Sequence, residues 1–204
     1  MQDAKEHSPV WEQRLDHFRD SLAHRPMPGC GAAASVTAAL GMALMLKGVH
    51  LSQQHETSEA RRVLIDEGER LKAQLAPLAD KDIAAFEGLM EAFQMPHGNE
   101  HEENARRRAI QQAAATAVDV PLTTARLCRE ALALGERAGE YSERQFASDA
   151  QAGCELLVAA LRSVLLNVEA NIDSLGSDAE KRHAQAAHDE LKKQVGASAR
   201  QDAV

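Results

Sequence analysis

Hydrophobic and polar positions alternate along most of the chain with the spacing of amphipathic helices. Near the start, Trp11, Leu15, Phe18 and Leu22 recur at intervals of three and four residues, and similar apolar stripes with charged opposite faces return later. Runs that alternate every second residue, which are typical of strands, are nearly absent. The pattern predicts an all-α bundle of about seven to eight helices, over residues 10–22, 32–47, 56–75, 80–94, 100–118, 122–138, 148–175 and 178–193.

The segment 28–46 departs from this pattern because it has no polar face. A turn from Pro28 to Gly31 leads into small and apolar residues, and the first charge is Lys47. A helix that is apolar all round is buried, and small side chains let neighbouring backbones approach closely. We therefore expect a helix that begins after Gly31 and lies at the centre of the bundle or in a subunit interface.

Local signals set the predicted boundaries in the middle of the chain. Asp80 is a suitable N-cap, which would place Asp82 in the first turn of the next helix. Pro121 suits the start of a helix, where its missing N–H costs nothing, so it separates two predicted helices. The sequence contains no recognisable linker, so we expect one domain over residues 1–204 with flexible ends at 1–8 and 196–204.

Composition and charge narrow the function classes. The net charge of −8 argues against a nucleic-acid partner, which would need clustered Lys and Arg. Cys30, Cys128 and Cys154 lack metal-site spacing, which indicates reduced thiols in a cytoplasmic protein. No signal peptide is recognisable, and the apolar run 30–46 is shorter than the ~20 residues of a membrane span, so no membrane partner is expected.

A few polar residues are candidates for chemistry. His97 and His101 are four residues apart, but Gly98 and Asn99 between them break the helix that a metal site would need, so we expect no metal. Asn167 and Asn171 share one face of a predicted helix. They form either a buried pair that links helices or an amide pair that lines a polar pocket, and the sequence leaves both open.

Four segments in order carry a family resemblance. They are the Pro28–Gly31 turn with its small-residue helix; the acidic segment 78–96; Arg106, Ala109, Ile110 and Gln111 with the later run 119–122; and Ser148-Asp149 followed by Asn167 and Asn171. Together they resemble the cyclodeaminase/cyclohydrolase family, which includes the C-terminal domain of formiminotransferase-cyclodeaminase and stand-alone methenyltetrahydrofolate cyclohydrolases.

The resemblance implies an all-helical protomer in an antiparallel homodimer, with a folate substrate bound near the dimer contact and no metal or redox cofactor. It implies a methenyltetrahydrofolate cyclohydrolase, which hydrolyses the N5,N10-methenyl bridge to give 10-formyltetrahydrofolate. The alternatives are a formiminotetrahydrofolate cyclodeaminase, which releases ammonia, and a non-catalytic folate-binding or helical partner protein.

Transferred onto matching positions, the resemblance also assigns residues. Asp149 is the favoured catalytic carboxylate and Asp82 the second candidate, because a carboxylate can stabilise the cationic bridge and take a proton from water. A basic segment that usually follows the small-residue helix is replaced here by residues 53–56, Gln-Gln-His-Glu. The predicted substrate-binding residues are Gly29, Cys30, Gly31, Ser148, Asn167, Asn171 and Arg106.

Overall fold

The computed structural model describes residues 8–201, with side chains up to residue 195. Within this range all regular elements that form are helices, joined by short turns and loops, which confirms the predicted all-α class. The elements are η1 (Val10–Glu12), α1 (Leu15–His24), α2 (Cys30–His55), α3 (Glu59–Leu75), α4 (Leu78–Gln94), α5 (Glu100–Tyr141), η2 (Arg144–Phe146), α6 (Ala147–Ile172) and α7 (Asp178–Gln201).

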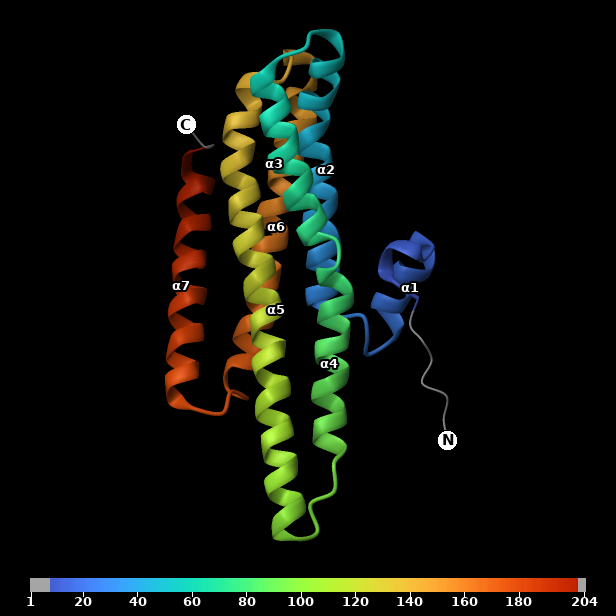
Figure 1. Cartoon of the computed structure of the whole chain (residues 1–204), viewed down its shortest axis with the longest axis vertical. Coiled ribbons are helices and arrows are strands. Elements are labelled where there is room, and N and C mark those ends of the chain that lie inside the picture. The colour runs from blue at the N-terminus through green and yellow to red at the C-terminus, as the bar shows by residue number, and fades with distance from the viewer. Residues whose placement is uncertain (1–7, 202–204) are drawn as a thin grey trace.

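Helix α2 lies at the centre of the bundle, in contact with α3, α4, α5 and α6 (Figure 1). Its small residues have the predicted effect. A Cβ atom placed on Gly41 would lie 2.8 Å from the carbonyl oxygen of Gly153 on α6. The two backbones therefore touch, and the large side chains of Met42, Met45 and Leu46 fill the spaces on either side without contact with solvent.

Most of the other helices run beside this pair along the long axis of the molecule. Helices α3 and α4 follow one another along one side, α5 spans the whole length, and α7 packs outside α5 and α6 (Figure 1). The N-terminal elements form a smaller cluster, in which Val10 and Phe18 pack against Ile83. The backbone N–H of Val10 also donates to Asp80 Oδ1 at 2.9 Å.

The prediction that two helices meet at Pro121 is wrong, because residues 100–141 form the single helix α5 with Pro121 inside it. Proline costs about 3 kcal/mol in a helix interior, since it removes one hydrogen bond and its ring crowds the preceding turn. Here Pro121 and its neighbours Val120 and Leu122 are buried. Packing against the surrounding helices offsets the local cost.

Other boundaries also differ from the predictions. Helix α4 already begins at Leu78, so Asp80 lies in its first turn and is not the N-cap. Helix α2 begins at Cys30 and continues to His55, beyond the predicted exit. The first predicted helix is interrupted between η1 and α1. Helix α7 extends past the predicted end, to Gln201. Residues 1–7 and 202–204, which fall in the ends predicted to be flexible, lie outside the described residues.

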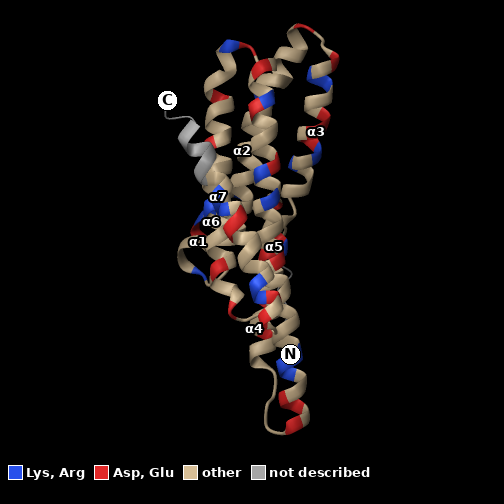
Figure 2. Cartoon of the chain, turned by 90° about the vertical axis from the view of Figure 1, so that its left-hand side faces the viewer, with Lys and Arg blue, Asp and Glu red and all other residues tan. Residues whose placement is uncertain are grey.

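The helix that contains the apolar run 30–46 is longer than the run itself, because α2 has 26 residues. Two segments, Cys30–His55 and Arg144–Ile172, are long and apolar enough to cross a membrane by length and composition alone. Other helices bury 67% of the most apolar window in the first and 39% of that in the second. Basic and acidic residues are interspersed along the helices, with no single-sign face in the view of Figure 2.

Candidate active site

The N-terminus of α2 is capped by a side chain from another helix. Its N-cap residue, Gly29, has no side chain to accept from the first turn. The carboxylate of Asp82 on α4 accepts the backbone N–H of Ala32 instead. Any Cβ atom on Gly31 would collide with Asp82 Oδ1. A glycine at position 31 is therefore what lets the carboxylate approach the helix end.

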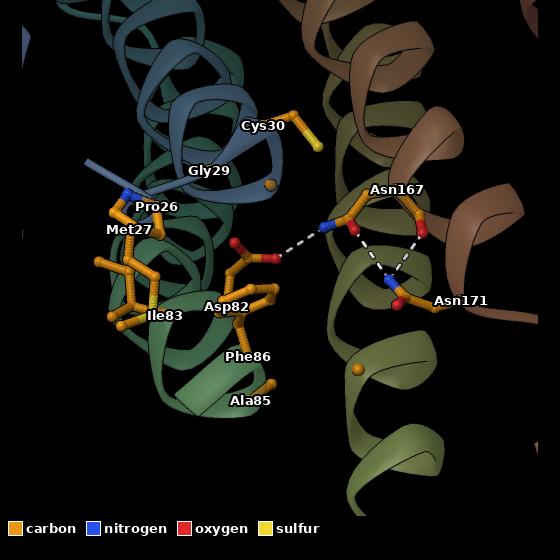
Figure 3. Close-up of a pocket in the computed structure, with 12 residues that line it drawn as sticks. Pro26, Met27, Gly29, Cys30, Asp82, Ile83, Ala85, Phe86, Asn167 and Asn171 are labelled. Atoms are coloured by element: carbon orange, nitrogen blue, oxygen red, sulfur yellow. Dashed lines mark hydrogen bonds between the residues drawn. The ribbon is translucent and has the colours of Figure 1, made fainter. Parts of the chain in front are cut away.

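Asn167 and Asn171 approach the same carboxylate from α6 (Figure 3). Asn167 Nδ2 donates to Asp82 Oδ1 at 2.9 Å. Asn171 Nδ2 donates to both the side-chain and the backbone oxygen of Asn167, each at 2.9 Å. These bonds fix which end of the Asn167 amide faces Asp82. The pair thus links α6 to α4 and also lines a pocket. Both alternatives that the sequence left open, a link between helices and the lining of a polar pocket, therefore apply.

A cavity of about 140 Å³ opens between Asp82 and the two asparagines. Its volume suits water and the reacting part of a ligand, so a larger ligand would extend beyond it. Cys30 lies on its upper side and Phe86 on its lower side in the view of Figure 3. The lining residues are Pro26, Met27, Gly29, Cys30, Gly31, Asp82, Ile83, Ala85, Phe86, Ala117, Asn167 and Asn171.

Burial raises the pKa of Asp82 above its ordinary value of 3.8, although the N–H of Ala32 and the amide of Asn167 partly oppose the shift. A carboxylate whose pKa is raised toward neutrality is a better proton acceptor than an exposed one. Burial, and then the charge of Asp82, also raises the pKa of Cys30 above 9.0, so this side chain is a thiol at neutral pH. Asp82 is therefore the group in the cavity suited to move a proton.

Three of the residues predicted for the site lie elsewhere in the protomer. Asp149 stands in the first turn of α6, 18 residues and about 27 Å along the helix from Asn167. Its Oδ2 accepts from Lys47 Nζ at 2.6 Å. Ser148 is exposed beside it. The guanidinium of Arg106 donates to the carbonyl of Phe93 at the end of α4, next to a different groove.

Several residues that line the cavity were not predicted from the sequence. Phe86 follows Asp82 by four residues, a spacing that places both on one helix face and could have suggested a shared wall. Pro26, Met27 and Ala117 had no such signal. Among the described residues, no three His, Cys, Asp or Glu side chains are grouped so that they could hold a metal ion.

Comparison with known proteins places this site in a family. The sequence pattern described as formiminotransferase-cyclodeaminase matches residues 14–192. The chain belongs to this family. The resemblance stated from the sequence is thereby confirmed, and the match extends over all the residues that enclose the cavity.

Individual relatives agree with this assignment. The chain is 33% identical over 168 residues to a methenyltetrahydrofolate cyclohydrolase from Methylorubrum extorquens, an alignment that covers 80% of this chain and 81% of that protein. It is 30% identical over 152 residues to the formimidoyltransferase-cyclodeaminase of Gallus gallus, but spans only 28% of that longer protein.

A solved structure shares the fold. The crystal structure of formiminotetrahydrofolate cyclodeaminase from Thermotoga maritima superimposes with a TM-score of 0.77, at 24% identity and with 92% of each chain covered.

Proposed function

We propose that this chain is a cytoplasmic methenyltetrahydrofolate cyclohydrolase, an enzyme of one-carbon metabolism that needs no cofactor. The observation that carries the proposal is the buried carboxylate of Asp82, held by Asn167 at the wall of a small cavity. The relative from Methylorubrum extorquens, which is similar over most of both chains and bears this name, supports the choice of reaction.

In the proposed mechanism, Asp82 acts first as a base and then as an acid. The carboxylate takes a proton from water as the water oxygen bonds to the bridge carbon, and the cationic amidinium becomes a neutral adduct. The acid then returns its proton to N5 while the bond between that nitrogen and the bridge carbon breaks. The hydroxyl of the adduct loses its proton to solvent and becomes the carbonyl of the 10-formyl product.

The neighbouring groups orient the carboxylate. Asn167 keeps one oxygen of Asp82 engaged, and Asn171 keeps the Asn167 amide from turning over. Cys30 and Gly31, the first residues of α2, line the same cavity. They lie at the positive end of the helix dipole, where a polar oxygen of the pterin or the adduct would be stabilised.

The test compares two matched substitutions. Asp82→Asn keeps the shape of the side chain but removes the base, so we expect turnover of methenyltetrahydrofolate, followed as loss of its chromophore, to fall about 100-fold or more. Asp149→Asn, which tests the carboxylate favoured from the sequence, should retain most of the rate. A near-normal rate for Asp82→Asn would overturn the assignment, and a large loss in Asp149→Asn alone would move the role to that residue.

Cyclodeaminase activity is the second candidate, because the Gallus gallus relative carries that name. Ammonia release from formiminotetrahydrofolate separates the two reactions, since hydrolysis of the methenyl bridge yields none. Folate binding without turnover of either compound would instead favour the non-catalytic alternative.

We also infer that the protein is a homodimer, joined through a face that α2 and α6 share. Exposed or half-buried small and apolar side chains follow both helices, and the Lys47–Asp149 pair supplies the charges on this face. Leu166 is 63% exposed and Leu40 49%, although soluble monomers rarely leave such stripes open. We define the α2–α6 face as Ala33, Thr37, Leu40, Ala43, Leu44, Lys47, Asp149, Ala152, Leu156, Ala159, Ser163 and Leu166.

A further inference from the structure

A second groove follows the candidate active site along the same helices. It holds about 400 Å³ and lies between α5 and the turn that joins α6 to α7. On α5, Ala117 of the first cavity is seven residues from Ile110 of the second, and Ser174 of the second follows the end of α6, three residues after Asn171 of the first. Residues seven apart on a helix share a face, so Ala117 and Ile110 lie on one side of α5. The cavity and the groove are therefore successive openings along one surface.

Helix α4 supplies aromatic rings along this surface. Phe86 and Phe93 follow Asp82 by four and eleven residues, so the three lie on one face of the helix. Both rings are part of the accessible surface, at 39% and 41% exposure. Phe86 lines the first cavity. Phe93 does not line the second groove but is next to it, because its backbone carbonyl accepts from Nε and Nη2 of Arg106, which does.

The far end of this surface is basic, although the chain has a net charge of −8. Arg106 and Arg107 both line the groove, and Glu103 is the acidic residue beside them. Only two of the five guanidinium donors of Arg106 are used by the Phe93 carbonyl. Arg107, which is exposed, contacts Asn104 on its own helix. In Figure 2 the basic run of α5 stands directly above the acidic first turn at the lower tip.

We propose that this arginine groove, formed by His97, Arg106, Arg107, Ile110, Gln111 and Ser174, binds the carboxylates of the glutamate tail of the substrate. The inference rests on the proposed function. The 140 Å³ cavity holds only the reacting bridge, so the rest of a folate must lie along the surface. From Ala117 to Arg107 is ten residues, about 15 Å, with Phe86 and Phe93 placed to contact the aminobenzoyl ring on the way.

The location of the arginine groove also bears on the absence of lysines from residues 53–56. The segment 53–56, where the family usually carries lysines, is at the C-terminal end of α2, whereas the cavity is at its N-terminal end. Cys30 and Gln53 are 23 residues apart, about 35 Å along the helix. Within one protomer, a tail that extends from the cavity along α5 reaches the arginine groove and not that segment.

The experiment measures KM and kcat with the mono- and triglutamate forms of methenyltetrahydrofolate. We expect the wild type to show a KM about tenfold lower for the triglutamate, since charge-assisted bonds to arginine are strong, with kcat unchanged. Arg107→Ala should remove most of this difference, and Glu103→Gln should enlarge it. Arg108→Ala is the matched control, because Arg108 also contacts Asn104 and is exposed but does not line the groove. Its KM values should stay at the wild-type level.

Equal KM values for the two wild-type substrates, or the same effect of Arg107→Ala and Arg108→Ala, would overturn this inference while leaving the cyclohydrolase assignment intact. Absence of turnover with both substrates would instead overturn the proposed function. In that case calorimetric titration with 5-formyltetrahydrofolate triglutamate decides the tail question: weaker binding by Arg107→Ala than by Arg108→Ala supports the groove, and equal binding rejects it.

Discussion

The absence of a side chain at Gly31 lets the N-terminus of α2, the carboxylate of Asp82 and the amide of Asn167 come together. A Cβ atom there would meet both Asp82 Oδ1 and Asn167 Nδ2, whereas one on Gly29 would meet nothing within 4 Å. Gly29 and Gly31 therefore have different structural roles. Gly31 makes room for the contact that defines the cavity, and Gly29 leaves the N-cap without a side chain so that Asp82 can supply the missing acceptor.

The raised pKa of Asp82 predicts a pH dependence of stability. Its pKa in the folded protein lies above the ordinary 3.8, so between these two values the folded state holds a proton that the unfolded state has released. The contribution of Asp82 to stability therefore falls as pH rises through this window. Urea unfolding of wild type and Asp82→Asn at several pH values isolates the effect, because Asn does not titrate. The free energy of unfolding of the wild type, relative to the variant, should decline with pH, and a rise would contradict the burial argument.

At the scale of helices, the site depends on how closely α2 and α6 pack. A Cβ atom on Gly153 would lie 2.6 Å from the carbonyl oxygen of Gly41 and from the backbone nitrogen of Met45. Backbone cannot move aside cheaply, so we expect Gly153→Ala to lower the free energy of unfolding by about 1–3 kcal/mol. Gly88→Ala is the control, because that position on α4 is open. It should stabilise by about 0.5–1 kcal/mol, as alanine does in a helix. Equal effects in denaturant titrations would contradict the close contact.

Helix positions were predictable from apolar spacing, and the buried character of α2 from its small residues, because both depend on local sequence. The continuation of α5 through Pro121 was not predictable, because it depends on the burial of the neighbouring residues in the folded protein. The site residues show the same contrast between what local sequence determines and what long-range packing determines. Asp82 and Asp149 both lie near helix starts, and nothing local indicates which one meets Asn167, 85 residues away from Asp82. Long-range packing selects Asp82 and leaves Asp149 with Lys47.

At the scale of the whole molecule, the α2–α6 face stands out because no other helix among the described residues covers it. Helices α3, α4, α5 and α7 cover the other sides of the bundle (Figure 1). A face with leucines flanked by alanines suits a flat helix-to-helix contact with a second copy, because a two-fold axis brings the same apolar patch against itself. Burial of this face in a dimer would also remove the most apolar part of α6 from water.

The oligomeric state tests this inference directly. In light scattering coupled to size exclusion, we expect the wild type at micromolar concentration to have the mass of a dimer, and Leu166→Glu to have that of a monomer, because a charge buried in an apolar contact lacks a partner. Val63→Glu is the matched control, since Val63 is 48% exposed on α3 and lies outside the α2–α6 face. It should remain dimeric. A monomeric wild type, or a Leu166→Glu variant that stays dimeric, would assign this face another role.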